Sequence, residues 1–110
     1  MKAQLRLGRL NCHITIQSLD QTPTEDGAVT ETPTTVCKCW ASIEPLGGRE
    51  LFIAREQQDT STHCIRLHYR AGITPQMRAL WNGRYFNFTS VINIGEINRE
   101  LEIMAMEVIA

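Results

Sequence analysis

Four cysteines and three histidines are the residues of this sequence best suited to bind a metal ion. Zinc prefers thiolate and imidazole ligands, which structural sites usually supply as closely spaced pairs. Cys37 and Cys39 form one C-x-C pair, and no second close pair completes a zinc ribbon. The full set is Cys12, Cys37, Cys39, Cys64, His13, His63 and His68. We therefore expect no metal and reduced thiols that act as small apolar strand residues, with a mixed Cys/His site as the alternative.

Other candidate catalytic groups lack the neighbours that catalysis needs. The turn at 47–49 is Gly-Gly-Arg and lacks the Gly-Lys-Ser/Thr of a phosphate-binding loop. His63 and His68 lie on one predicted strand at odd spacing, so their side chains point to opposite faces. Glu44 and Glu50 flank a Pro/Gly turn, where solvated carboxylates are far more common than an acid–base pair. The sequence therefore predicts neither an enzyme nor a bound cofactor.

The charge balance of the chain narrows the class of partner. Eleven Lys and Arg face 12 Asp and Glu in 110 residues, a formal net charge of −1, and 43% of the residues are hydrophobic. This composition is typical of one globular domain over residues 1–110 and disfavours a strongly cationic nucleic-acid binder. No apolar run is long enough for a signal peptide or for a membrane span of about 20 residues. We expect synthesis in the cytoplasm and no membrane partner.

The elements that must position these groups are mostly strands, because the dominant hydrophobic period is two. Strands are predicted at 12–17, 36–43, 64–70, 77–81, 84–91 and 100–108. Asn82-Gly83 between two apolar runs predicts a tight hairpin turn. A helix is predicted at 49–58, lying on the sheet with Leu51, Ala54 and Gln58 on one face. The fold class is mainly β, a small antiparallel barrel of about six strands with one short helix.

A polar tract at 20–34 interrupts this pattern. It contains two prolines, many threonines and an Asp-Gly pair, with almost nothing to bury. We expect a long protruding loop, since loops of this length in compact domains are usually functional or disordered. The threonines also allow an alternative, a protruding hairpin centred on Asp26-Gly27.

Two further packing predictions concern apolar strand residues. Leu101 and Ile103 lie on one face of the last strand and Met104 and Met106 on the other, so this strand belongs inside a sheet or against a partner. Trp40 is expected to anchor the core.

Aromatic and basic residues gather in the second half of the chain and keep a nucleic-acid alternative open. The aromatic residues are Tyr69, Trp81, Tyr85, Phe86 and Phe88, and the arginines are Arg66, Arg70, Arg78 and Arg84. Such a set is typical of a small barrel that binds single-stranded nucleic acid. The neutral net charge argues against this class, and any small barrel needs aromatic residues in its core. The same arginines could pair with an acidic surface of a neighbouring subunit.

Several segments resemble one known family. Residues 40–50 match the passage W-A-x-I-x-P-x-x-G-x-E, residues 8–17 resemble the family's opening strand, and residues 65–74 resemble its R-Y-R-x-G-I strand and turn. Residues 83–88 and 99–103 match its closing hairpin and last strand. The chain thus resembles the head–tail joining (head closure, or stopper) proteins of tailed bacteriophages. One departure is His68, which stands where the family has arginine.

The resemblance implies a structural virion protein with a small antiparallel β-barrel and one helix packed beside it. Such proteins assemble as a ring, commonly of twelve, beneath the portal and its adaptor. The ring closes the DNA-filled head and offers a surface to the tail. The implied partners are further copies of the chain, the portal or adaptor protein, a tail or tail-completion protein and the genomic DNA in the channel. The implied location is the virion, after assembly in the host cytoplasm.

In such a ring, two sets of residues are candidates for function. The loop carries Asp20, Glu25, Asp26, Gly27 and Glu31. Its carboxylates could gather in the channel and repel DNA as a gate, or the loop could order on docking to a partner. Candidates for subunit or partner contacts are Arg66, His68, Arg70, Arg84, Met104 and Met106. The exposed edges of a small barrel are further candidates, because a ring needs two different contact faces.

Overall fold

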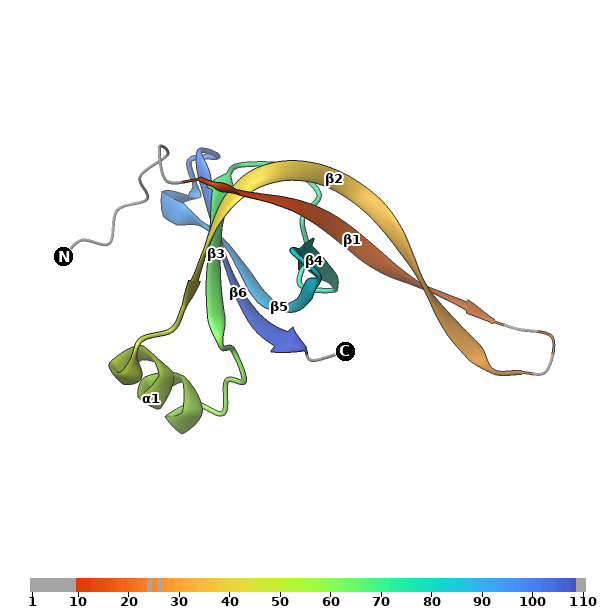
Figure 1. Ribbon diagram of the computed structural model, residues 1–110, viewed down its shortest axis with the longest axis horizontal. Coiled ribbons are helices and arrows are strands. Elements are labelled where there is room, and N and C mark those ends of the chain that lie inside the picture. Colours follow the sequence, from red (N-terminus) through yellow and green to blue (C-terminus); the bar gives the residue numbers. More distant parts are fainter. Residues whose placement is uncertain (1–9, 24, 26, 109–110) are drawn as a thin grey trace.

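The computed structural model describes residues 10–23, 25 and 27–108, with the backbone alone at 20–23 and 29–31 (Figure 1). Within these described residues, six strands, one helix and one short 3-10 turn follow one another. They are β1 (Cys12–Pro23), β2 (Val29–Pro45), α1 (Gly48–Glu56), β3 (His63–His68), β4 (Met77–Trp81), β5 (Arg84–Asn93), η2 (Ile94–Glu96) and β6 (Glu100–Val108). The prediction of six strands and one short helix is confirmed.

The six strands close into a barrel in the order β1-β2-β3-β6-β5-β4, and all neighbours are antiparallel. Closure occurs where β1 pairs with β4, between Thr15 and Leu80 at one end and Ser18 and Met77 at the other. A closed barrel leaves few open strand edges. Among the described strands, open edges remain where β1 and β2 run beyond the barrel and on the β4 side of β5 after Asn87, so the expectation of exposed edges is confirmed at these places.

The barrel interior is filled by the inward residues of alternating strands. Its largest side chains are less than 2% exposed and include Ile14, Ile16, Ile65, Leu67, Phe86 and Ile103. On β6, Leu101, Ile103 and Ala105 are buried while Met104 and Met106 are half-buried on the outside. The prediction that β6 lies inside a sheet is confirmed, because β6 pairs with β3 on one side and β5 on the other.

Trp40 is not in this core. Its side chain is 56% exposed, whereas Ala41 beside it is fully buried. The small residues Cys37, Cys39 and Ala41 occupy the inward phase of β2, which turns Trp40 outward. The prediction of a core anchor is wrong because β2 carries apolar residues in both phases.

The polar tract at 20–34 is a hairpin, not a loop. Asp20 pairs with Thr32, and the ladder continues to Pro23 opposite Val29. The expectation of a long protruding loop is wrong, and the alternative of a protruding hairpin is confirmed. Gly27 at its end has a φ of +87°, which glycine adopts without strain. Prolines are tolerated because each strand here has an open edge that needs no hydrogen bond.

We call this projection, residues 19–33, the arm. A β-bulge comes shortly before it, where Ile16 pairs with Cys37 but Gln17 pairs with Thr35. On β1 the arm continues for five residues beyond Ser18, a length of ~17 Å. In Figure 1 the two strands of the arm twist across each other as they extend away from the barrel. The arm helps to explain a radius of gyration of 14.9 Å, above the ~13 Å expected for a compact chain of this length.

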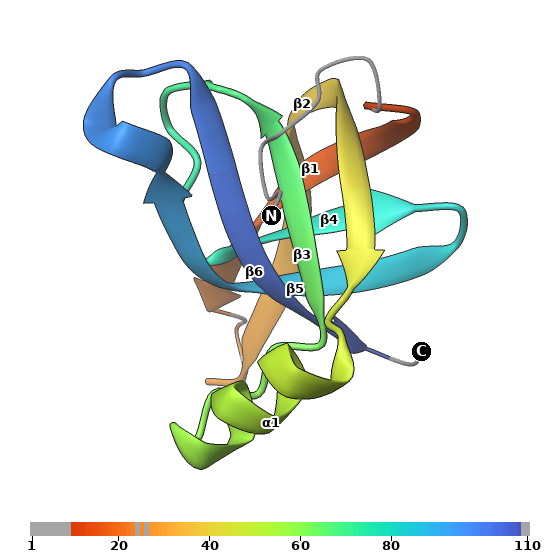
Figure 2. The same cartoon turned by 90° about the vertical axis from the view of Figure 1, so that its left-hand side faces the viewer.

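Helix α1 lies beyond one end of the barrel, and the η2 turn lies at the opposite end (Figure 2). Within α1 only Ala54 is buried, and the side chains of Phe52 and Ile53 are 64% and 43% exposed. The predicted helix at 49–58 is confirmed up to Glu56, but Gln58 has a φ of 60° and lies outside it. The helix thus lies beyond one end of the barrel and does not cover the sheet, contrary to expectation.

Candidate functional site

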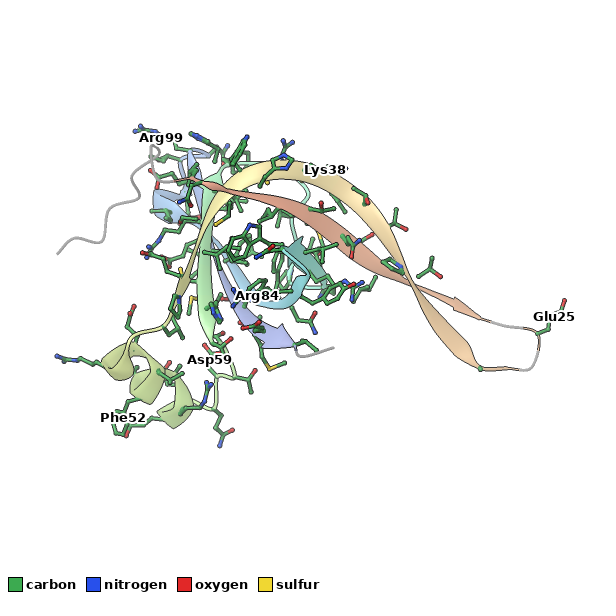
Figure 3. The ribbon with its side chains drawn as sticks, viewed as in Figure 1. Glu25, Lys38, Phe52, Asp59, Arg84 and Arg99 are labelled. Atoms are coloured by element: carbon green, nitrogen blue, oxygen red, sulfur yellow. The ribbon has the colours of Figure 1, made fainter. Side chains whose placement is uncertain are left out.

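The acidic residues of the tract 20–34 all belong to the arm. Asp20 and Glu31 lie on its two strands, and nothing is described of their side chains. Glu25 and Gly27 are exposed at its far end, as Figure 3 shows for Glu25. Asp26 lies outside the described residues. The paired backbone therefore carries Asp20 and Glu31, with Glu25 beyond them, away from the barrel.

Two of the candidate contact arginines are engaged within the chain. Arg66 donates to Glu102 at 2.9 Å and 3.1 Å and to Glu44 at 3.2 Å. Arg84 binds both carboxylate oxygens of Glu107, at 2.8 Å and 2.9 Å. The two parallel hydrogen bonds of Arg84, and the two bonds of Arg66 to a single oxygen of Glu102, fix the orientation of each guanidinium. Both arginines therefore hold neighbouring strands together before any partner is considered.

The remaining contact candidates lie on the surface. His68 and Arg70 are exposed at the end of β3 and just after it. Met104 and Met106 are half-buried on the outer side of β6. The structure thus does not bring the six candidates into one patch, because Arg84 binds Glu107 beside the start of β3, whereas Arg70 follows the end of β3.

A charged cluster covers the core at the α1 end of the barrel. Arg84 lies over the Phe86 ring at 5.1 Å, and the His63 ring meets Phe86 edge-on at 5.1 Å. His63 Nε2 is 3.9 Å from Glu107 Oε1. Burial lowers the pKa of His63 below its ordinary value, although the Glu107 carboxylate acts in the opposite direction. The neutral imidazole therefore closes the apolar interior beneath an arginine–glutamate pair.

A second polar network ties α1 to the barrel. Asp59 Oδ1 accepts hydrogen bonds from the Ser61 amide at 2.9 Å and hydroxyl at 2.7 Å. The fully buried Ser61 hydroxyl also shares a 2.5 Å hydrogen bond with Thr89 on β5. Arg55 at the end of α1 donates to the carbonyls of Asp59 and Ser61. Sequence reasoning missed this anchor, which the Asp-x-Ser turn pattern could have indicated.

The cysteines are free thiols, as predicted. Burial raises the pKa of Cys39 to about 11 and that of Cys64 to about 12, so both stay protonated at neutral pH. Among the residues that the structure describes, no three His, Cys, Asp or Glu side chains meet in an arrangement that would hold a metal ion.

The aromatic residues of the second half do not form one stacking surface. Phe86 and Phe88 are buried in the barrel. Tyr85 faces outward beneath the Arg78 guanidinium, which lies 4.3 Å from the ring centroid. Bases need several exposed rings along one groove. This distribution gives the nucleic-acid alternative no support.

Several large apolar side chains are exposed among the residues that the structure describes, and Val36 and Tyr69 are among them. Phe52 and Ile53 lie on α1, Trp40 lies on β2 against the His13 ring at 4.9 Å, and a third set lies around η2. The third set consists of Ile92, Ile94 and Ile97. Exposed apolar groups that gather at the ends of a small domain are typical of contact surfaces for other proteins. Sequence periodicity gave no signal for Ile92, Ile94 and Ile97 because they sit in and beside a turn.

Comparison with known proteins gives a consistent result. A family model of the phage head completion protein matches residues 5–108. The solution structure of protein SF1141 from Shigella flexneri 2a is 28% identical, covers 94% of this chain and 96% of its own, and superposes with a TM-score of 0.75. No curated protein matches the chain.

A chain from the virion of a native gene transfer agent particle is 15% identical, with 97% of this chain and 100% of that chain covered and a TM-score of 0.64. At that identity the likeness shows the fold alone. No helix among the described residues is long and apolar enough to cross a membrane. The resemblance to head–tail joining proteins is confirmed by the family match, which covers nearly the whole chain. This protein belongs to the phage head completion family, whose members are structural components of the virion.

Proposed function

We propose that this protein forms a ring at the head–tail junction, beneath the portal and its adaptor, where it closes the DNA-filled head and presents a docking surface to the tail. The observation that carries the proposal is the family match over residues 5–108. The role is mechanical and electrostatic, and it uses no catalytic group.

The two ends of the barrel support contacts with two different neighbours along the channel. One end carries Phe52 and Ile53 on α1, and the other carries Ile92, Ile94 and Ile97 around η2 (Figure 2). Apolar patches of different composition suit different protein partners. One end would meet the adaptor and the other the tail.

The arm supports control of the channel. The sequence from 20 to 34 holds four carboxylates, Asp20, Glu25, Asp26 and Glu31, and no Lys or Arg. In a ring, arms that point inward would concentrate negative charge around the axis and repel DNA. A paired ribbon holds such charge at a more defined distance from the barrel than an unpaired loop would. We assign the arm a gating role, and partner docking is the competing outcome.

Removal of the gene from the phage genome tests the ring proposal. We expect filled heads that lose their DNA and carry no tails, as seen by electron microscopy and by the amount of DNase-protected DNA. A plasmid copy of the gene should restore tailed, filled particles. Normal particles without the gene would overturn the proposal.

Two complementing variants separate gating from docking. In the first, Asn-Gly replaces residues 19–33 and closes the hairpin between the paired Ser18 and Thr34. In the second, Asp20→Asn, Glu25→Gln, Asp26→Asn and Glu31→Gln neutralise an arm of full length. Gating predicts DNA loss with both variants. Tails missing only with the shortened arm would assign docking instead, and normal particles with both would remove each role.

A further inference from the structure

The outer surface of the barrel is divided by charge. On the outward positions of β3, β6 and the adjoining end of β2 lie Glu44, Glu100 and Glu102, with Arg66 and His68 among them. Arg66 is already bound by Glu44 and Glu102. Three carboxylates against one guanidinium leave this side negative. We call these five residues the acidic face. Arg99 lies beyond it, at the end of the barrel (Figure 3).

In the part of the barrel that the structure describes, the outward positions around β1 carry no carboxylate. The outward positions of β1, of β2 next to it and of β4 hold cationic, aromatic and neutral side chains, which are His13, Thr15, Gln17, Lys38, Trp40, Arg78 and Leu80. Lys38 and Trp40 are exposed, as Figure 3 shows for Lys38. Arg78 is held in place by Gln17 at 2.9 Å and by the Tyr85 ring. We call His13, Lys38, Trp40 and Arg78 the basic face.

The strand order sets the strands of the two faces around different parts of the barrel, and β2 carries part of each face, with Lys38 and Trp40 beside β1 and Glu44 beside β3. In the circle β1-β2-β3-β6-β5-β4, β1 lies across from β6 and β4 lies across from β3. A molecule with complementary charge on two different faces can bind the next copy by simple repetition, which is a heterologous contact. Such contacts close into a ring, and in a ring of about twelve copies each subunit is turned by roughly 30° relative to the next.

We propose that neighbouring subunits of the ring pack head to tail, with the basic face of one copy on the acidic face of the next. This inference rests on the proposed function, because it assigns the lateral contact within that ring. Trp40 supplies the central apolar anchor, as exposed tryptophans do at protein interfaces. Lys38 supplies the charge that selects the acidic partner and sets the register.

A second copy fits the basic face better than DNA does. The face carries only one Lys, one Arg and one His, and the Arg78 guanidinium already has two partners within the chain. The face also carries Trp40, a large apolar side chain that is 56% exposed. Phosphate binding needs several free cations in a row. Every copy of the chain carries the matching carboxylates on its acidic face, so a partner for the basic face is always present in equal number.

Charge reversal in the complementing gene tests the contact. Lys38→Glu and Glu44→Lys alter exposed side chains, so the subunit should still fold, which thermal melting of the purified chains checks. Each variant alone should lower the yield of tailed, filled particles by about tenfold or more, which corresponds to about 1.4 kcal/mol. Co-expression of the two should restore the yield, because alternating copies again meet opposite charges.

Arg49→Glu and Glu56→Lys are the comparison variants, since they reverse exposed charges off both faces, on the helix that the proposed function assigns to the adaptor or the tail. Any loss of tailed, filled particles that they cause should persist when the two are co-expressed, because the two positions do not meet across the lateral contact. Parental yields from Lys38→Glu and Glu44→Lys, in a phage that fails without the gene, would overturn the contact and leave the ring intact. Loss of DNA retention with Lys38→Glu that Glu44→Lys does not rescue would assign the basic face to DNA. Normal particles without the gene would instead reject the proposed function.

Discussion

Trp40 and Phe86 are both aromatic strand residues, but Phe86 points into the barrel and Trp40 points out of it. Phe86 is fully buried in the barrel and Trp40 is 56% exposed on its outside. Period-two alternation alone could not assign Trp40, because β2 holds apolar residues on both faces. The small inward residues Cys39 and Ala41 set the phase, and only the packed barrel reveals that small residues belong there.

Alanine substitution at these two positions should give very different stabilities. Phe86→Ala removes a ring from a closed core and should lower the free energy of unfolding by about 3–5 kcal/mol. Trp40→Ala should change it by only about 0.5 kcal/mol, as for other surface positions. Urea denaturation of both chains measures the difference. A Trp40→Ala loss as large as that of Phe86→Ala would contradict the outward placement.

His63 should make folding sensitive to mild acid. Burial lowers its pKa in the folded chain, so the unfolded chain binds the proton more readily. The stabilising effect of the neutral ring is complete above the unfolded value of roughly 6.5 and is lost as the pH falls below it. Stability should therefore drop between about pH 7 and 5, and His63→Gln should flatten that drop. The exposed His68→Gln is the control, and an equal flattening there would contradict the assignment.

At the scale of elements, strands and turns were far easier to predict than the arm. Asn82-Gly83 gave the hairpin directly, and both residues have positive φ, 52° and 76°. The arm's ladder is built from threonines and crossed by Pro23 and Pro33, so no hydrophobic alternation marks it. Its pairing continues a ladder that begins inside the barrel, and this long-range support is invisible in the local sequence.

The Asn82-Gly83 turn should be sensitive to a single methyl group. Gly83→Ala forces a side chain into left-handed backbone and should cost about 1–2 kcal/mol, although nothing blocks the space around it. Gly48→Ala is the matched control, because Gly48 has equally open space without positive φ and lies in the first turn of α1. Thermal unfolding compares the two. Equal melting temperatures would contradict a strained turn.

At the scale of the whole molecule, the sequence predicted the class of fold but not its surfaces. Alternation predicted the strands, and their close spacing predicted an antiparallel barrel. The division into acidic and basic faces depends on the order in which the strands close, β1-β2-β3-β6-β5-β4. Strand order is a property of the assembled barrel, and residues as distant as Arg66 and Glu102 become neighbours only through it.

The arm and the barrel should differ in backbone protection. Amides of β3 and β6 lie in the closed ladder, so they should exchange with solvent only on global unfolding. Amides of the arm should exchange about a hundredfold faster in the free subunit, because the arm opens without disturbing the core. Hydrogen exchange followed by mass spectrometry measures both. Equal protection in the free subunit would contradict an independent arm, and slowing in assembled particles would map its contact.

The open edges of the arm also bear on how the subunit survives before assembly. A two-stranded ribbon with unpaired amides is a template for runaway stacking into fibrils, and newly made subunits accumulate at high local concentration. Pro23 and Pro33 lie on opposite strands of the ribbon, and proline has no amide hydrogen to offer an incoming strand. The same residues that hid the hairpin from sequence patterns thus act as gatekeepers against aggregation.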